Sequence, residues 1–233
     1  MRIVLISNSG RPFLSWCRPI LAEFLGESRT VAFVTAANLG DERLYHQRVH
    51  EALEPRPPDG LGLTILHCYW RSEPLAALER AQAVFVGGGN TYALLKRLRE
   101  ARLLDAIRDR VRAGIPYIGS SAGSNIAGPN ILTTNDWNVV GLGGFAALGL
   151  VPFNVNPHYL ETDGAMAAHS ETRDDRIAEY HVVNPNPVAG VEESTAIRVD
   201  DGVATVHGTG RVKLFRRGRP PQWFAPGERL DIE

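Results

Sequence analysis

The stretch Ile115-Pro116-Tyr117-Ile118-Gly119-Ser120-Ser121-Ala122-Gly123-Ser124-Asn125 begins as a short apolar run and ends in a cluster of small residues. The apolar part predicts a buried strand over Ile115–Gly119, followed by a sharp turn into a helix. Within the turn, Gly119–Gly123 fits the G-x-S-x-G pattern of a nucleophile elbow with Ser121 at its centre. Such a strained turn needs small neighbours, because the backbone packs closely there. Taken alone, the pattern fits a glycine-rich helix start equally well, so the rest of the chain has to decide.

Apolar strands alternate with amphipathic helices on both sides of this turn. Besides Ile115–Gly119, the pattern predicts strands at Ile3–Ser7, Thr30–Thr35, Leu63–His67, Ala83–Val86, Leu150–Val155 and Val188–Val191. It predicts helices at Trp16–Leu25, Asp41–Leu53, Tyr92–Arg99, Leu103–Ala113 and Thr172–Tyr180, and a short one with Ser72 as N-cap and Pro74 in its first turn. This alternation indicates an α/β fold with a largely parallel sheet that is covered on both faces.

The C-terminal part has a different pattern. Short strands are expected at Ala196–Val199, Ala204–His207 and Val212–Phe215, separated by glycine-containing turns, which predicts an antiparallel β-meander. The sequence has no internal repeat and no obvious linker. We therefore expect a single α/β domain over residues 1–233, with residues 196–233 as an antiparallel β extension.

Composition narrows the classes of function. The 233 residues are 44% hydrophobic and carry a formal net charge of -1, from 25 basic and 26 acidic residues. That balance gives no reason to expect nucleic acid or a membrane surface as partner. Cys17 and Cys68 are isolated and fit reduced core thiols. The first apolar run is too short for a signal peptide or a membrane helix. We expect a soluble, cytoplasmic protein.

Polar residues follow the ends of several predicted strands. Gly87–Asn90 follows one, Ser121 another, His158 comes closely after Leu150–Val155, and Glu193 comes after Val188–Val191. In open α/β sheets, functional groups gather at the carboxyl ends of the strands. Their shared position is a stronger indication of an active site than any one of the motifs.

His158 is the best candidate for the base that a nucleophilic serine requires. It lies in Asn154-Val155-Asn156-Pro157-His158, a strand end closed by a proline. His46 and His50 are one helical turn apart, but no further ligands follow at zinc-like spacing, so we expect a solvated helix surface and no metal. Two of the remaining histidines, His67 and His207, lie on predicted strands. His169 and His181 flank a charged helix, and His169 is a candidate substrate contact.

Two carboxylates compete to orient the histidine. Asp136 lies in a polar loop soon after the elbow helix, whereas Glu193 follows a strand on the same edge as His158. That position favours Glu193, with Asp136 as a supporting or substrate-binding residue, and the choice stays open. The neighbouring Glu192 fits surface charge.

The turn Gly87-Gly88-Gly89-Asn90 fits an oxyanion hole better than a phosphate site. It lacks both the G-x-G-x-x-G spacing and a following Gly-Lys-Ser/Thr. Glycine lets the backbone approach a substrate carbonyl, so the N–H of Gly88 can face a developing oxyanion. The N–H of Ala122, directly after the serine, is expected as the second donor. No cofactor is expected.

Several segments, taken together and in order, resemble peptidase E, the α-aspartyl dipeptidase family of serine peptidases. They are Ile6-Ser7-Asn8-Ser9, Val86–Thr91, Tyr117–Asn125, Thr133-Thr134-Asn135-Asp136, Asn156-Pro157-His158 and Glu171-Thr172-Arg173. The resemblance extends from the first strand to about Glu193 and covers most of the chain. Cyanophycinases and glutamine-amidotransferase-like proteins share the elbow but match fewer of these segments.

The resemblance implies a flavodoxin-like, class I glutamine amidotransferase-like α/β fold. It also implies a serine peptidase that releases an N-terminal aspartate from Asp-X dipeptides, with Ser121 as nucleophile and His158 as base. The family's third residue has been assigned both to the position of Asp136 and to that of Glu193. This chain departs from the family where Ser120 replaces a common aromatic residue and Glu192 a common proline. Substrate preference can therefore differ.

The substrate class fits the charges on offer. An Asp-X dipeptide presents a side-chain carboxylate and an ammonium group, so its pocket needs a cation and acceptors. Arg173 has the planar guanidinium that binds carboxylates through two hydrogen bonds, although a surface ion pair with Asp174 or a neighbouring glutamate explains it equally well. We expect Asn90 and Gly89 to contact the substrate.

Two other functions stay open. One is a cyanophycinase-like or broader acyl-aspartyl peptidase, and the other is a non-catalytic module that binds amino acids or peptides on the same fold. A nucleotide-binding protein ranks lower, since a phosphate motif is missing. A homodimer is compatible with the sequence, which does not define the oligomeric state.

Overall fold

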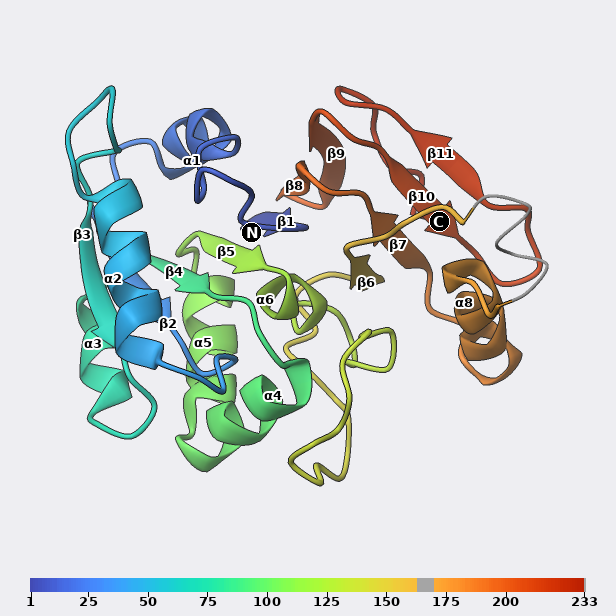
Figure 1. The fold of residues 1–233 in the computed structure, drawn as a ribbon, viewed down its shortest axis with the longest axis horizontal. Helices are drawn as coiled ribbons and strands as arrows, with labels where there is room; N and C mark the ends of the chain where they lie inside the picture. Colours follow the sequence, from blue (N-terminus) through green and yellow to red (C-terminus); the bar gives the residue numbers. More distant parts are fainter. Residues whose placement is uncertain (163–169, 233) are drawn as a thin grey trace.

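The computed structural model describes residues 1–162 and 170–232, and its strands form two sheets (Figure 1). The larger sheet has seven strands in the order β3-β2-β4-β5-β1-β8-β9, of which β3 to β1 are parallel and β8 and β9 antiparallel. They span Arg2–Ile6 (β1), Thr30–Val34 (β2), Thr64–Cys68 (β3), Ala83–Val86 (β4), Tyr117–Ser120 (β5), Thr195–Asp200 (β8) and Val203–Gly208 (β9). The prediction of an α/β fold with a largely parallel sheet and antiparallel C-terminal strands is confirmed.

Helices cover both faces of the larger sheet, as the alternation of strands and helices predicts. On β1, Val4 and Ile6 pack toward one face and Ile3 and Leu5 toward the other, because side chains alternate along a strand. The first face is covered by α1 (Arg18–Leu25) and α2 (Glu42–Leu53), and the second by α3 (Pro74–Arg80), α4 (Thr91–Glu100) and α5 (Leu103–Arg112).

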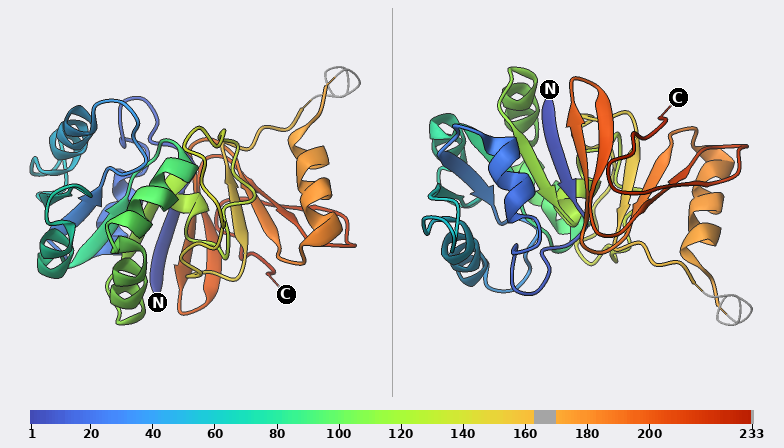
Figure 2. Two further views of the ribbon diagram at one scale, coloured as in Figure 1. Left: turned by 90° about the horizontal axis from the view of Figure 1, so that it is seen from below. Right: turned by 90° about the horizontal axis from the view of Figure 1, so that it is seen from above.

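The smaller sheet has the strand order β11-β10-β7-β6. Its strands are Asn154–Pro157 (β6), Val188–Val191 (β7), Val212–Phe215 (β10) and Gln222–Phe224 (β11), and only the β6–β7 pair is parallel. Side chains of β6, β7 and β10 share one hydrophobic core with residues of β1, β8 and β9. The opposite face is covered by α8 (Arg173–Val183), which lies at the far end of the molecule from α2 and α3 (Figures 1 and 2).

The predicted C-terminal meander is wrong. β8 and β9 form a hairpin at the edge of the larger sheet, but β10 crosses to the smaller sheet and pairs with β7 on one side and β11 on the other. Turn residues identify where a strand ends and not which strand it pairs with next. Every residue of Val188–Val191 and Val212–Phe215 is buried, which this second sheet makes possible.

Two local predictions also need correction. β6 begins at Asn154 and not at Leu150, because the buried residues before it lie in a bend whose N–H groups bond the 126–128 region. The N-cap of α3 is Glu73, with a left-handed φ of +42° and no side-chain cap, and not Ser72, whose N–H donates to the Tyr69 carbonyl in a turn.

A long segment over residues 128–153 connects α6 (Ala122–Asn125) to the smaller sheet. It is held by arginines that donate to its carbonyl groups: Arg99 binds Gly143, Gly144 and Ala146, and Arg108 binds Ala147 and Leu148. Among the helices of the described residues, none is both long and apolar enough to cross a membrane.

Candidate active site

Ser121 stands at the turn between β5 and α6. Its φ of +53° lies in the left-handed region that non-glycine residues rarely adopt, and its N–H donates to the Ile6 carbonyl at 3.0 Å. The flanking glycines are required by space. A Cβ on Gly119 would lie 2.5 Å from the Gly123 carbonyl oxygen, and one on Gly123 would lie 2.0 Å from that of Val86. The turn therefore has the strained, closely packed geometry of a nucleophile elbow.

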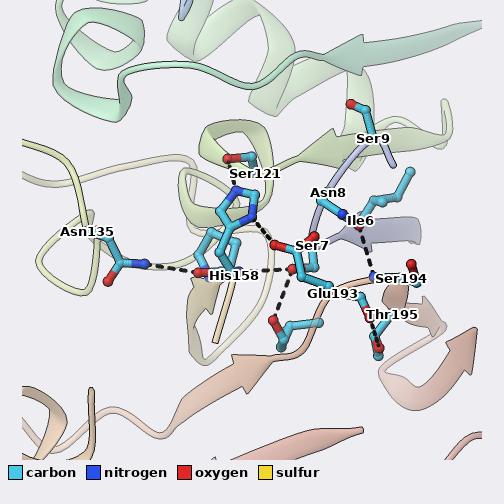
Figure 3. Close-up of polar contacts among 12 residues, drawn as sticks. Ile6, Ser7, Asn8, Ser9, Ser121, Asn135, His158, Glu193, Ser194 and Thr195 are labelled. Atoms are coloured by element: carbon cyan, nitrogen blue, oxygen red, sulfur yellow. Dashed lines mark hydrogen bonds and ion pairs between the residues drawn. The ribbon is translucent and has the colours of Figure 1, made fainter. Parts of the chain in front are cut away.

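A continuous chain of hydrogen bonds joins Ser121, His158 and Glu193 (Figure 3). The Oγ of Ser121 lies 2.7 Å from Nε2 of His158, and Nδ1 of His158 lies 2.6 Å from Oε1 of Glu193. A carboxylate only accepts hydrogen bonds, so Nδ1 carries a proton, and Nε2 of the neutral ring accepts from the serine hydroxyl. This is the arrangement in which a histidine can remove the serine proton.

The three side chains come from different parts of the fold. Ser121 follows β5 of the larger sheet, whereas His158 directly follows β6 and Glu193 lies between β7 and β8. The sequence places all three after strand ends, but they do not lie at the edge of a single sheet. The His158 and Glu193 side chains are 42% and 53% exposed, so the site opens to solvent on this side.

Asp136 is not part of this chain. Its Oδ2 accepts from the N–H of Thr91 at 2.7 Å, from the Thr91 hydroxyl at 2.6 Å and from the Thr134 hydroxyl at 3.1 Å. Thr91 is the first residue of α4, so the carboxylate binds a helix N-terminus, where negative charge is favourable. Within residues 1–162 and 170–232, no hydrogen bond joins Asp136 to His158.

The glycine turn lies beside the serine. A Cβ on Gly88 would lie 3.0 Å from the Cβ of Ser121, and one on Gly89, where φ is +137°, would lie 2.3 Å from the Ala37 carbonyl oxygen. The N–H of Gly88 donates to the Tyr45 hydroxyl at 2.8 Å. In the described part of the chain, the N–H groups of Gly89 and Ala122 donate to no other residue.

A cavity of about 480 Å³ lies over the serine and the glycine turn. Ser121, His158, Gly88–Asn90, Tyr45 and Arg48 are among the residues that line it. Ser120 is also at the wall, and its hydroxyl lies 3.4 Å from that of Ser9.

Asn90 has both of its side-chain groups engaged in the fold. Its Oδ1 accepts from the N–H of Ala93 and so caps α4, and its Nδ2 donates to the Trp137 carbonyl at 2.9 Å. The residue lines the serine cavity from the start of the helix. A substrate that contacts the Asn90 side chain would therefore have to share its amide with these two hydrogen bonds.

Arg173 lies at the start of α8. It donates to Oδ1 of Asn135, whose Nδ2 in turn donates to the Pro157 carbonyl at 2.9 Å. The alternative ion pair with Asp174 does not form, because that carboxylate binds Lys213 at 2.8 Å. No carboxylate of residues 1–162 or 170–232 makes a salt bridge with Arg173, and burial, with the nearby Arg176 charge, lowers the pKa of its guanidinium.

A second cavity, of about 430 Å³, is lined by Arg173, Asn135 and Asn156 among others. The side chain of Asn156 is buried, and its Oδ1 has no hydrogen-bond partner among the described residues. Glu192, the neighbour of Glu193, is not among the residues that line either cavity. It accepts from the N–H of Arg211 at 2.7 Å and forms an ion pair with the Arg211 guanidinium at 3.4 Å. Its charge is therefore paired, which the sequence does not indicate.

The other histidines lie elsewhere. His46 stacks on His67 at 4.4 Å between ring centroids, and burial lowers the pKa of His67 to about 4. His50 pairs with Glu54. In the part of the chain that the structure describes, no cluster of three or more histidine, cysteine or carboxylate side chains could hold a metal ion. His169 lies outside the described residues.

Comparison with known proteins identifies the family. The sequence profile of Peptidase family S51 matches residues 3–207. The chain belongs to this family of serine peptidases.

Relatives of this S51 peptidase extend over nearly the whole chain. "Peptidase E" of Streptomyces coelicolor is 40% identical over 99% of this chain and 93% of its own, and "Probable alpha-aspartyl dipeptidase" of Drosophila melanogaster is 40% identical over 96% and 93%. A crystal structure of a Listeria monocytogenes protein assigned to peptidase E has a TM-score of 0.70 and 26% identity, and the match covers 90% of this chain and 98% of that one.

Sequence reasoning missed two residues of the S51 site. Tyr45 lies in a helix of ordinary amphipathic pattern, and nothing in that pattern indicates that its hydroxyl binds the glycine turn. Asn135 lies in the segment Thr133–Asp136 with no sign in the sequence of its own role, yet it links Arg173 to the residue before His158. The only sign of Asn135 in the sequence is its position directly before Asp136, the competing candidate for the orienting acid.

Exchanging each carboxylate for its amide separates the two candidates for the orienting acid. We expect Glu193→Gln to lower kcat about 100-fold or more, since an uncharged partner no longer stabilises the imidazolium. The free energy of unfolding should stay within about 0.5 kcal/mol, as for other surface substitutions. Asp136→Asn should instead lower the free energy of unfolding by about 1–2 kcal/mol, because three hydrogen bonds at the α4 terminus weaken.

Turnover of Asp-p-nitroanilide and urea unfolding of both variants provide the measurements. Full kcat in Glu193→Gln would contradict the role of Glu193. A loss of kcat in Asp136→Asn at an unchanged free energy of unfolding would instead identify Asp136 as the orienting acid.

Proposed function

We propose that this S51 peptidase is a serine dipeptidase that hydrolyses Asp-X dipeptides through an acyl-enzyme. The observation that carries the proposal is the unbroken contact from Ser121 through His158 to Glu193, with distances of 2.7 Å and 2.6 Å. The names of relatives that align over more than nine-tenths of the chain support the substrate class.

The reaction proceeds in two stages. The Oγ of Ser121 attacks the carbonyl carbon of the N-terminal aspartate while Nε2 of His158 takes its proton, and Glu193 stabilises the imidazolium. The imidazolium then gives the proton to the leaving amine of the second residue, and the aspartyl group stays on Ser121 as an ester. A water molecule, deprotonated by His158, attacks this ester. The imidazolium then returns the proton to the Oγ of Ser121 as the ester bond breaks and aspartate leaves.

The oxyanion formed at each stage needs N–H donors. Ala122 and Gly88 are the proposed donors, since Ala122 follows the nucleophile and Gly88 packs against its Cβ. The N–H of Gly88 is bonded to the Tyr45 hydroxyl, so the oxyanion has to replace that hydroxyl as its acceptor. The N–H of the adjacent Gly89 is a further donor at the same turn.

Arg173 is the proposed partner of the substrate's side-chain carboxylate. Its charge is partly buried and has no carboxylate partner in residues 1–162 and 170–232, which favours binding an external anion. Its link through Asn135 to the Pro157 carbonyl keeps it close to His158. Asn90 and Gly89, at the wall of the serine cavity, are the proposed contacts of the substrate's main chain.

We also infer a cytoplasmic location. Cys17 and Cys68 are both free and buried, which fits a reducing compartment. The proposed partner is a small peptide with an N-terminal aspartate, and no cofactor takes part in the proposed steps.

Removing the nucleophile tests the proposal directly. We expect Ser121→Ala to abolish cleavage of Asp-p-nitroanilide and Asp-Leu, because Ser121 is the serine whose hydroxyl is hydrogen-bonded to the base, His158. The wild-type protein should cleave Asp-Leu and leave Glu-Leu and β-linked Asp-Arg intact. Turnover in folded Ser121→Ala would rule out the mechanism, and cleavage of β-linked Asp-Arg would favour a cyanophycinase-like activity. Aspartate binding without turnover or phosphonate labelling would indicate a binding module.

Arg173 and Arg176 form a matched pair on α8. Both line the second cavity, but Arg176 pairs with Glu171 at 2.9 Å. We expect Arg173→Gln to raise the KM for Asp-Leu about 10- to 100-fold, the loss of one charge-assisted interaction. Arg176→Gln should leave KM within about twofold, as for a surface ion pair. Equal KM values for Arg173→Gln and the wild type would remove Arg173 from the substrate site.

Tyr45→Phe tests the oxyanion donors. Phenylalanine keeps the ring packed against Phe33 but removes the hydroxyl that occupies the Gly88 N–H. We expect kcat for Asp-p-nitroanilide to be unchanged or to rise, because this N–H is then free for the oxyanion. A fall in kcat of about 100-fold or more, the loss expected for one missing oxyanion donor, would instead assign the donor to the Tyr45 hydroxyl.

A further inference from the structure

Ser7 lies at the junction of the two sheets, directly after β1. The residue is 1% exposed, and its hydroxyl bridges two main-chain groups of the smaller sheet (Figure 3). It accepts from the N–H of His158 at 2.9 Å and donates to the Val191 carbonyl at 3.0 Å. The main chain of Ser7 is itself fixed, because its N–H donates to the Thr195 carbonyl at 2.9 Å.

The backbone of His158 needs support of this kind. Its φ of +56° is left-handed, a conformation that a histidine keeps only where its surroundings impose it. Contacts on both sides fix the neighbouring residues: the Pro157 carbonyl accepts from Asn135, and the N–H of Tyr159 donates to the Val191 carbonyl at 2.9 Å. Ser7 supplies the bond to the N–H of His158 itself.

We propose that Ser7 is a positioning residue for the S51 reaction, whose hydroxyl holds the His158 main chain where the imidazole reaches both Ser121 and Glu193. The proposal rests on the proposed function of this site. Ser7 touches neither the reacting atoms nor the imidazole. It acts through the backbone, by fixing the main-chain position from which the His158 imidazole projects.

The same hydroxyl also sets the position of the acid. Val191, which accepts from Ser7, is two residues before Glu193, and the N–H of Ser194, directly after Glu193, donates to Oδ1 of Asn8 at 2.9 Å. The pair Ser7-Asn8 therefore holds both sides of Glu193 as well as the backbone of His158. A hydroxyl can do this because it donates and accepts at once, which neither alanine nor the weakly bonding thiol of cysteine can match.

Ser7→Ala and Ser7→Cys test the proposal, with Thr133→Val as matched control. The Thr133 hydroxyl is also buried and donates to the Val155 carbonyl at 3.0 Å, so its loss weakens the same strand three residues before His158. We expect both Ser7 variants to lower kcat for Asp-p-nitroanilide about tenfold or more at a KM within about twofold of wild type. They should slow phosphonate labelling of Ser121 by the same factor. Thr133→Val should change neither.

A second readout does not depend on activity. The proton on Nδ1 of His158, held in a 2.6 Å hydrogen bond to Glu193, should give a strongly downfield proton resonance that disappears in His158→Gln. We expect this resonance in the wild type and in Thr133→Val and its loss in Ser7→Cys and Ser7→Ala. Wild-type kcat, or an unchanged resonance, in either folded Ser7 variant would overturn the proposal. If folded Ser121→Ala keeps its turnover and so rules out the serine mechanism, the resonance still tests whether Ser7 positions His158.

Discussion

The hydrogen bonds of the Ser7 hydroxyl are the physical link on which the site depends. The nucleophile belongs to the larger sheet and the histidine to the smaller one, so their 2.7 Å contact requires that the two sheets keep a fixed relative position. Hydrophobic packing supplies most of the free energy that holds the two sheets together, but it does not depend on direction. The buried hydrogen bonds at the end of β1 fix the relative position of the sheets, because each needs a defined distance and angle.

Strained backbone also occurs at the same place. Ser121, His158 and Ser194 all have positive φ values, and each adjoins or belongs to the hydrogen-bonded chain of Ser121, His158 and Glu193. Such conformations persist only where neighbouring contacts hold them. Asp136 contributes from a distance, since it fixes the start of α4, where the glycine turn ends. The two carboxylates thus have different tasks: Glu193 contacts the imidazole, and Asp136 supports the turn beside the serine.

The sequence predicts the larger sheet well because its signals are local. Ala83–Val86 is found at its predicted bounds and Thr30–Thr35 ends only one residue earlier, at Val34. The prediction that Ser121, His158 and Glu193 lie together follows from the position of each after a strand. The pairing in the smaller sheet was not predictable in this way, since the turn after β9 shows where that strand ends and not that β10 pairs with β7 instead of β9. Nor was the Tyr45 contact to Gly88, because an amphipathic helix pattern identifies the buried face and not the partner of one hydroxyl.

The central claim is that Ser121 carries the aspartyl group during turnover. Rapid mixing of the protein with Asp-p-nitroanilide, acid quenching and intact-mass spectrometry measure it directly. The account predicts a transient mass increase of one aspartyl residue, which peptide mapping locates on Ser121 and which is absent from Ser121→Ala. Hydrolysis without any such adduct under conditions that trap an ester, or an adduct on another residue, would contradict it.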